Sequence, residues 1–194
     1  MRRDGILHLI PPVLFLSFAL LACATSGSWL NSDRIRHTFG SYGVEVLYAD
    51  RDRRVSNLYS GEGPNRVMRT YAVVNFAGNL APALAGEHEK ILAGASIGST
   101  FRRAGWQIEK HHTFIGALEV PETYEAIAEN MRVNLPRELA VHSYLFVVTR
   151  DQRSYNYATI TEVHHPDYLT ALRLQEIYGE IIFDDARRTS ADLI

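Results

Sequence analysis

Two long strand-like runs, at positions 139–149 and 154–163, constrain the fold more than any other feature of the sequence. Both runs are rich in β-branched and aromatic residues, and only a few polar residues around Asp151 and Gln152 separate them. This pattern is typical of a β-hairpin, in which the turn fixes which residues face each other. With Asp151 and Gln152 as the turn, the pairs expected on one face are Val148 with Tyr155, Phe146 with Tyr157, Tyr144 with Thr159, and His142 with Thr161.

A meander of three strands is predicted ahead of the hairpin, at residues 44–48, 55–60 and 66–76. Short polar loops connect these strands, so they must pair in antiparallel fashion. A fourth strand is predicted at 106–114. We therefore expect a single α+β domain, with a mainly antiparallel sheet of about six strands packed with two or three helices.

Helices are predicted where apolar residues recur at spacings of three and four and where capping or stop residues flank them. The predicted segments are 34–37, 82–104 with a break near Ser96, 121–131, and 168–178 capped by Asp167, and a last strand is predicted at 181–183. Both faces of the hairpin are partly apolar, so helices are expected to cover one face and other segments to shield part of the second.

The single cysteine, Cys23, lies at the end of an N-terminal apolar run. Residues 1–3 include two arginines, residues 13–21 are almost entirely apolar, and Ala22 precedes the cysteine. This order of basic region, apolar region and small residue is typical of a secretory signal peptide. A retained membrane anchor is the alternative, but the continuous apolar part has only about half of the roughly 20 residues needed to cross a bilayer.

Leu20-Leu21-Ala22-Cys23 resembles the lipobox of bacterial lipoproteins, with Leu at −3, a small residue at −1 and Cys at +1. The resemblance implies cleavage before Cys23 and acylation of its thiol and amino group. Ala24, rather than Asp, after the cysteine is similar to lipoproteins sorted to the outer membrane, facing the periplasm. The mature chain as a whole resembles proteobacterial lipoproteins of unassigned function, and that resemblance implies no activity.

On this interpretation, residues 1–22 form the signal peptide, 23–33 the acylated N-terminus and a flexible tether, and 34–194 one domain. The mature chain has 172 residues and a net charge of −3, because the leader contains two arginines and one aspartate. That length suits one hydrophobic core, and a lone cysteine leaves no internal disulfide, so packing must stabilise the domain. No basic run stands out, which argues against a nucleic-acid partner.

Residues 94–98 read G-A-S-I-G and match the nucleophile elbow of α/β-hydrolases. Ser96, Asp151 and His164 also follow one another in the chain order of such a hydrolase. An elbow requires a strand-to-helix turn, whereas the residues before Ser96 are predicted to be helical. The alternative interpretation is that the two glycines let the helix lie close to its neighbours.

Two adjacent histidine pairs, His111-His112 and His164-His165, raise the question of a metal site. Zinc binds three or four N, O or S ligands, and adjacent strand residues point to opposite faces, so each pair can supply one ligand per face. His111, His142 and His165 are the candidate ligands. No established spacing such as H-E-x-x-H is present, and a histidine that caps a helix or closes a turn is the alternative.

The sequence favours a membrane-anchored envelope lipoprotein that acts by binding, holding an envelope protein or a glycan near the membrane, with no cofactor. Tyr144, Tyr155 and Tyr157 offer a contact surface for such a partner, unless they pack beneath a helix. The alternative is a periplasm-facing hydrolase that uses Ser96 or a histidine-based metal site.

Overall fold

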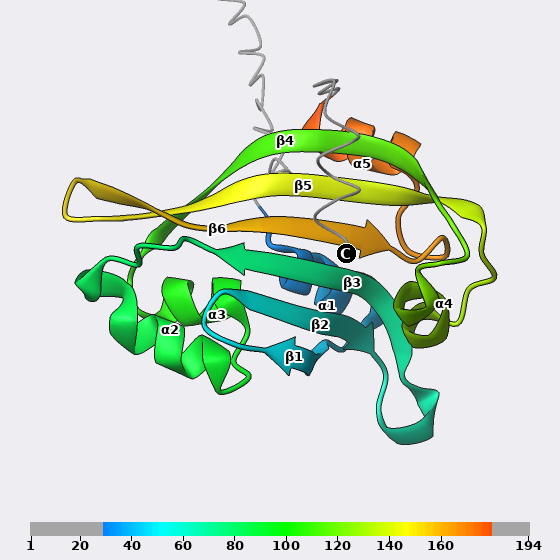
Figure 1. The fold of residues 1–194 in the computed structure, drawn as a ribbon, viewed down its shortest axis with the longest axis horizontal. Coiled ribbons are helices and arrows are strands. Elements are labelled where there is room, and N and C mark those ends of the chain that lie inside the picture. The colour runs from blue at the N-terminus through cyan, green and yellow to red at the C-terminus, as the bar shows by residue number, and fades with distance from the viewer. Residues whose placement is uncertain (1–28, 180–194) are drawn as a thin grey trace, which may run out of the picture.

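A computed structural model describes residues 29–179, and its centre is a six-stranded sheet with the order β1-β2-β3-β6-β5-β4 (Figure 1). All neighbouring strands are antiparallel. The strands are β1 Gly43–Ala49, β2 Arg53–Ser60, β3 Val67–Phe76, β4 Gln107–Val120, β5 Arg137–Arg150 and β6 Arg153–His164. The predicted α+β class and the antiparallel sheet of six strands are therefore confirmed. Cys23, the signal peptide and the strand predicted at 181–183 lie outside the described residues.

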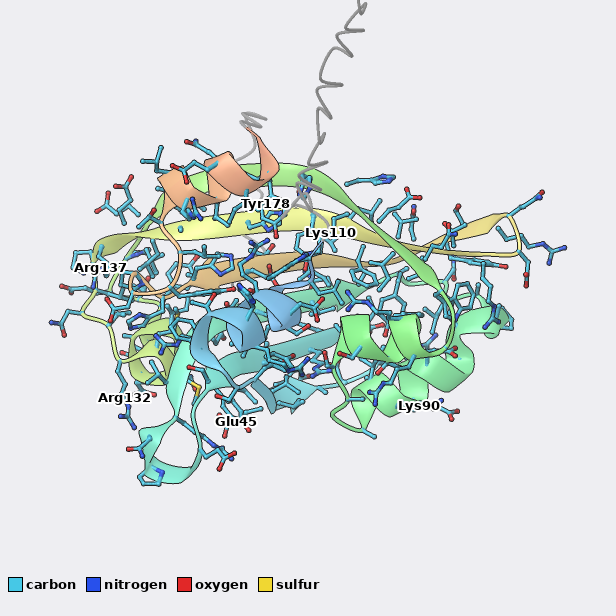
Figure 2. The ribbon with its side chains drawn as sticks, turned by 180° about the vertical axis from the view of Figure 1, so that it is seen from behind. Glu45, Lys90, Lys110, Arg132, Arg137 and Tyr178 are labelled. Carbon is cyan, nitrogen blue, oxygen red and sulfur yellow. The ribbon has the colours of Figure 1, made fainter. Side chains whose placement is uncertain are left out.

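Five α-helices accompany the sheet in the described part of the chain, rather than two or three. We call the face covered by α1, α2, α3 and α5 the inner face, seen from the helix side in Figure 2, and the face covered by α4 the outer face. No helix among residues 29–179 is long and apolar enough to cross a membrane. The helices are α1 Asn31–Phe39, α2 Ala85–Leu92, α3 Ile97–Arg103, α4 Glu125–Met131 and α5 Ala171–Tyr178.

The helix boundaries correct two predictions. The first helix begins at Asn31, and Asn31 and Ser32 are buried, so the tether predicted for 23–33 extends too far into the domain. The last helix is capped by Thr170, whose side-chain oxygen accepts from the backbone nitrogen of Arg173, and not by Asp167. The predicted break near Ser96 is confirmed, because the single helix expected at 82–104 is divided into α2 and α3.

Apolar side chains fill the space on both faces of the sheet. On the inner face, Phe101 of α3 packs with Phe146 and Tyr157. On the outer face, Ile127 and Met131 of α4 pack with valines of β3, β5 and β6. Tyr144 and Tyr157 are buried beneath helices, so this part of the hairpin is not an exposed contact surface.

A β-bulge at Tyr157 changes the predicted register of the β5–β6 hairpin. Val148 pairs with Tyr155 as predicted, but beyond the bulge His142 pairs with Glu162 rather than with Thr161. Because successive strand residues point to opposite faces, one extra residue exchanges the faces of everything that follows. The observed pairs that replace the predicted ones are Phe146 with Ala158, Tyr144 with Ile160, and His142 with Glu162.

Candidate functional site

The centre of the inner face carries buried polar side chains between its apolar clusters. We call this set the polar layer, and each member is at most 6% exposed. It lies beneath α1, near Lys110 and Tyr178, which are close together in Figure 2. Its members are Asn31 of α1, Thr70 of β3, His142 of β5, and Glu162 and His164 of β6.

Asn31 connects the polar layer to the helix above it. Its Nδ2 donates to Thr70 Oγ1 and to Glu162 Oε1, both at 3.1 Å. Its Oδ1 accepts a hydrogen bond of 2.6 Å from Tyr168 Oη. The first residue of α1 is thus fixed to two strands and to the segment before α5, which explains how a residue assigned to the tether belongs to the core.

The two histidines of the polar layer each have one hydrogen-bonded ring nitrogen. His142 Nε2 lies 2.7 Å from Nδ1 of His112, and His164 Nδ1 lies 3.1 Å from Oγ1 of Thr70. The other two nitrogens, His142 Nδ1 and His164 Nε2, are buried and have no hydrogen-bond partner within residues 29–179. His142 Nδ1 lies 3.7 Å from Glu162 Oε2, which is too far for a good hydrogen bond.

Burial determines the charge state of the polar layer. It disfavours imidazolium and lowers the pKa of His142 to about 3 and that of His164 to about 4. Burial on its own would raise the pKa of the Glu162 carboxyl group. Its interaction with His142 and the positive charge of Lys110 outweigh this effect and lower the pKa of Glu162 to about 2. At neutral pH the layer therefore holds two neutral imidazoles and one carboxylate.

A cavity of about 70 Å³ lies between α1, α3 and the inner face, next to the polar layer. Glu162 lines it, as do two cationic side chains, Lys110 of β4 and Arg54 of β2. Lys110 Nζ is buried 4.4 Å from the ring centroid of Tyr144, and no described residue offers it a hydrogen-bond partner. Lys110 also lines a groove along β4, together with His111 and His112, so it lies between the cavity and the surface.

Arg54 is 1% exposed, and the backbone holds its guanidinium in place. Its Nη1 donates to the carbonyl oxygens of Ile91 at 2.9 Å and Ala95 at 2.7 Å, and its Nε donates to Ser56 Oγ at 2.9 Å. These acceptors are neutral, so they hold the guanidinium of Arg54 in place without cancelling its charge.

The predicted catalytic residues Ser96, Asp151 and His164 do not form a triad. Ser96 has ordinary extended dihedral angles, follows a loop after α2, and its Oγ accepts from Tyr42 Oη at 3.2 Å. Asp151 is 91% exposed at the hairpin turn, whereas His164 is buried at the other end of β6, roughly 36 Å away along the strand.

Both glycines of the G-A-S-I-G segment have structural roles. Gly94 has a φ of +103°, which strongly favours glycine. A Cβ on Gly98 would lie 2.4 Å from Leu30 Cδ1, so glycine lets α3 approach the start of α1. The motif is explained by chain geometry.

The predicted metal ligands His111, His142 and His165 are not brought together either. His111 has a side chain that is 59% exposed and lies 3.3 Å from Glu109. The Nδ1 atom of His165 accepts from the backbone nitrogen of Asp167 in a turn, as the alternative interpretation expected. The histidines close to His142 are the other members of the two pairs, His112 and His164.

The spacing Glu162-x-His164 was the signal that the sequence offered for this site, because residues i and i+2 of a strand share a face. His142 on the neighbouring strand completes the group.

No protein-family model matches the chain, and no curated protein matches it.

Proposed function

We propose that the chain is an acylated lipoprotein of the cell envelope whose domain binds a small anion in the cavity between α1 and the sheet. The lipobox residues around Cys23 support the membrane attachment. The buried ammonium group of Lys110, which faces the cavity, carries the proposal of binding. An envelope protein or a glycan remains the predicted macromolecular partner.

Lys110 is unlike the other lysine of the chain. The sequence has only two, and Lys90 is exposed on α2, as Figure 2 shows. Burying a charge without a hydrogen-bonded partner is costly, and the ring of Tyr144 compensates for only part of the lost hydration. A ligand that accepts hydrogen bonds from Nζ would remove this cost, so the position of Lys110 favours binding at the cavity.

The charges around the cavity favour an anion. Lys110 and Arg54 contribute two positive charges and Glu162 one negative charge. Neither cation forms an ion pair in the part of the chain that the structure describes. Since Tyr42 donates to Ser96 Oγ, the hydroxyl hydrogen of Ser96 is available to a ligand. The cavity volume corresponds to about five to seven water positions, which suits a carboxylate or phosphate-sized anion.

Binding without catalysis agrees best with the partners of Ser96. Its hydroxyl contacts Tyr42 rather than a histidine or a carboxylate, so no residue between 29 and 179 is positioned as a general base to activate it. The domain would lie close to the membrane, since only seven residues lie between Cys23 and Asn31, and the eight steps from one to the other span at most about 29 Å.

Calorimetric titration of the purified, acylated protein in detergent with phosphate, acetate and sulfate tests the proposed binding. We expect at least one of these anions to bind with a stoichiometry of one. Lys110→Met keeps the aliphatic chain and should lower the affinity at least ten-fold. Lys90→Met is the matched control and should not change it. Absence of saturable binding, or equal effects of the two substitutions, would contradict the proposal.

Attachment to the membrane is tested separately with Cys23→Ala. Metabolic labelling with palmitate should mark the wild-type chain and not the variant, and the variant should leave the membrane fraction. A variant that is still labelled, or a wild-type chain that is not, would rule out acylation at Cys23.

A further inference from the structure

We propose that His142, Glu162 and His164 form a binding site for a divalent transition-metal ion such as zinc, next to the anion-binding cavity, which Glu162 also lines. His142 of β5 pairs directly with Glu162 of β6, and His164 lies two residues further along β6, on the same face. One potential ligand atom from each of the three side chains lies within 4.8 Å of the other two. Two imidazole nitrogens and a carboxylate oxygen are a donor set that zinc binds in proteins.

The unpartnered nitrogens identify the donor atoms. His142 Nδ1 and His164 Nε2 are fully buried, and neither has a hydrogen-bond partner in the described chain. Burying a polar nitrogen in this way costs stability unless something binds it. A metal ion between the two rings would satisfy both nitrogens at once, whereas a purely structural role would not require two unsatisfied atoms beside the same carboxylate.

The partners of the remaining ring nitrogens also favour a metal site. A histidine that binds a metal through one nitrogen usually uses its other nitrogen in a hydrogen bond that fixes the ring. His142 has this arrangement through Nε2 and His112, at 2.7 Å, and His164 has it through Nδ1 and Thr70, at 3.1 Å. Glu162 is held similarly, since Oε1 accepts from Asn31 and leaves Oε2 on the side of His142.

The size of the site is close to that of a zinc site. Zinc binds nitrogen and oxygen ligands at about 2.0–2.2 Å, so tetrahedral ligands are about 3.4 Å apart. From separations of up to 4.8 Å, each donor atom must move by less than about 1 Å to reach this geometry. Small rotations of the three side chains would provide that movement, and the fourth position of the tetrahedron would be left for water.

Titration of the metal-free, acylated protein in detergent with Zn²⁺ tests the site. The protein is treated with a chelator, dialysed, and kept in a buffer without phosphate. We expect one equivalent of Zn²⁺ to bind, and Co²⁺ to give the intense visible absorption of a four-coordinate site. Glu162→Gln and His164→Gln should each lower the Zn²⁺ affinity at least 100-fold, because each removes one of three ligands.

His111→Gln is the matched control, because His111 is an exposed histidine close to the site but on the other side of β4. It should leave the Zn²⁺ affinity unchanged. Imidazole ¹⁵N spectra of the wild-type protein give a second measurement that does not depend on the folding of variants. Zn²⁺ should shift the signals of His142 and His164 and leave those of His37 and His111 in place.

Three results would overturn the metal site. These are the absence of saturable Zn²⁺ binding to the wild-type protein, an equal loss in His111→Gln and Glu162→Gln, and shifts confined to other histidines. Lys110→Met distinguishes this proposal from that of the anion site, because it should lower the anion affinity at least ten-fold and retain Zn²⁺ binding.

Discussion

Helices pack on both faces of the sheet, but the two faces bury different chemistry. On the outer face α4 covers valines, and the buried hydroxyl groups of Ser143 and Thr161 satisfy each other at 2.7 Å. On the inner face, Lys110, His142 and His164 each keep a buried nitrogen without a hydrogen-bond partner among residues 29–179. The outer face also has two such atoms, Arg53 Nε and Asn57 Oδ1, but neither belongs to a group of potential metal ligands among these residues. On the inner face, the three unpartnered nitrogens lie close together, and packing does not explain why they are buried there. We therefore assign ligand binding to the inner face.

The largest expected effect is on the outer face. Ile127→Ala removes a side chain that is 1% exposed from the contact between α4 and the sheet. We expect the free energy of unfolding to fall by about 2–5 kcal/mol. Denaturant unfolding measures this loss, while the anion and Zn²⁺ affinities of the folded protein should not change.

Leu172→Ala is the control for Ile127→Ala, because Leu172 is also on a helix but is 68% exposed. It should change the free energy of unfolding by no more than about 0.5 kcal/mol. If Ile127→Ala also abolished anion and Zn²⁺ binding by the folded protein, it would be wrong to assign ligand binding to the inner face alone.

Lys110→Met should raise the free energy of unfolding, whereas Ile127→Ala should lower it. Replacing an unpaired buried ammonium by an apolar chain of similar size should stabilise the ligand-free protein by about 1 kcal/mol, net of the lost contact with the Tyr144 ring. It should also raise the Zn²⁺ affinity on the order of ten-fold, because a neighbouring positive charge repels the ion. A variant that is less stable and unchanged toward Zn²⁺ would contradict both expectations.

Thr70→Val should change stability and Zn²⁺ affinity by about as much as Lys110→Met, but it should lower both. The substitution keeps the shape of Thr70 and removes the oxygen that contacts His164 Nδ1 and Asn31 Nδ2. We expect a loss of about 1 kcal/mol in stability and of about ten-fold in Zn²⁺ affinity. Zinc titration at equal protein concentration measures the second effect, and an unchanged affinity would show that Thr70 does not position His164.

The sequence was sufficient to predict the six strands and the antiparallel class of the sheet, and local patterns explain why. The alternating runs, the short loops of the meander and the turn at Asp151 are local signals, and they specify β1 to β3 and the β5–β6 hairpin. The break between α2 and α3 was predicted for the same reason, because Gly94 and Gly98 mark it within a few residues.

The polar layer was not predicted, because two of its determinants are not local. The bulge at Tyr157 moves Glu162 and His164 to the face of His142, and no turn residue in the sequence announces it. Asn31 reaches Glu162 across 131 positions of the chain, from a segment whose composition indicated a tether. The prediction of His111 and His165 as ligands was wrong, because their neighbours His112 and His164 are the histidines that lie beside His142.

Binding of an anion by Lys110 inside the domain can be measured directly, because the chain has only two lysines. Labelling the Cε atoms of lysine with ¹³C should give two signals in the NMR spectrum of the acylated protein in detergent. During titration with phosphate or acetate we expect the Lys110 signal to shift saturably while the Lys90 signal stays in place. If both signals stay in place, or both move together in proportion to the salt concentration, Lys110 is not part of an anion-binding site.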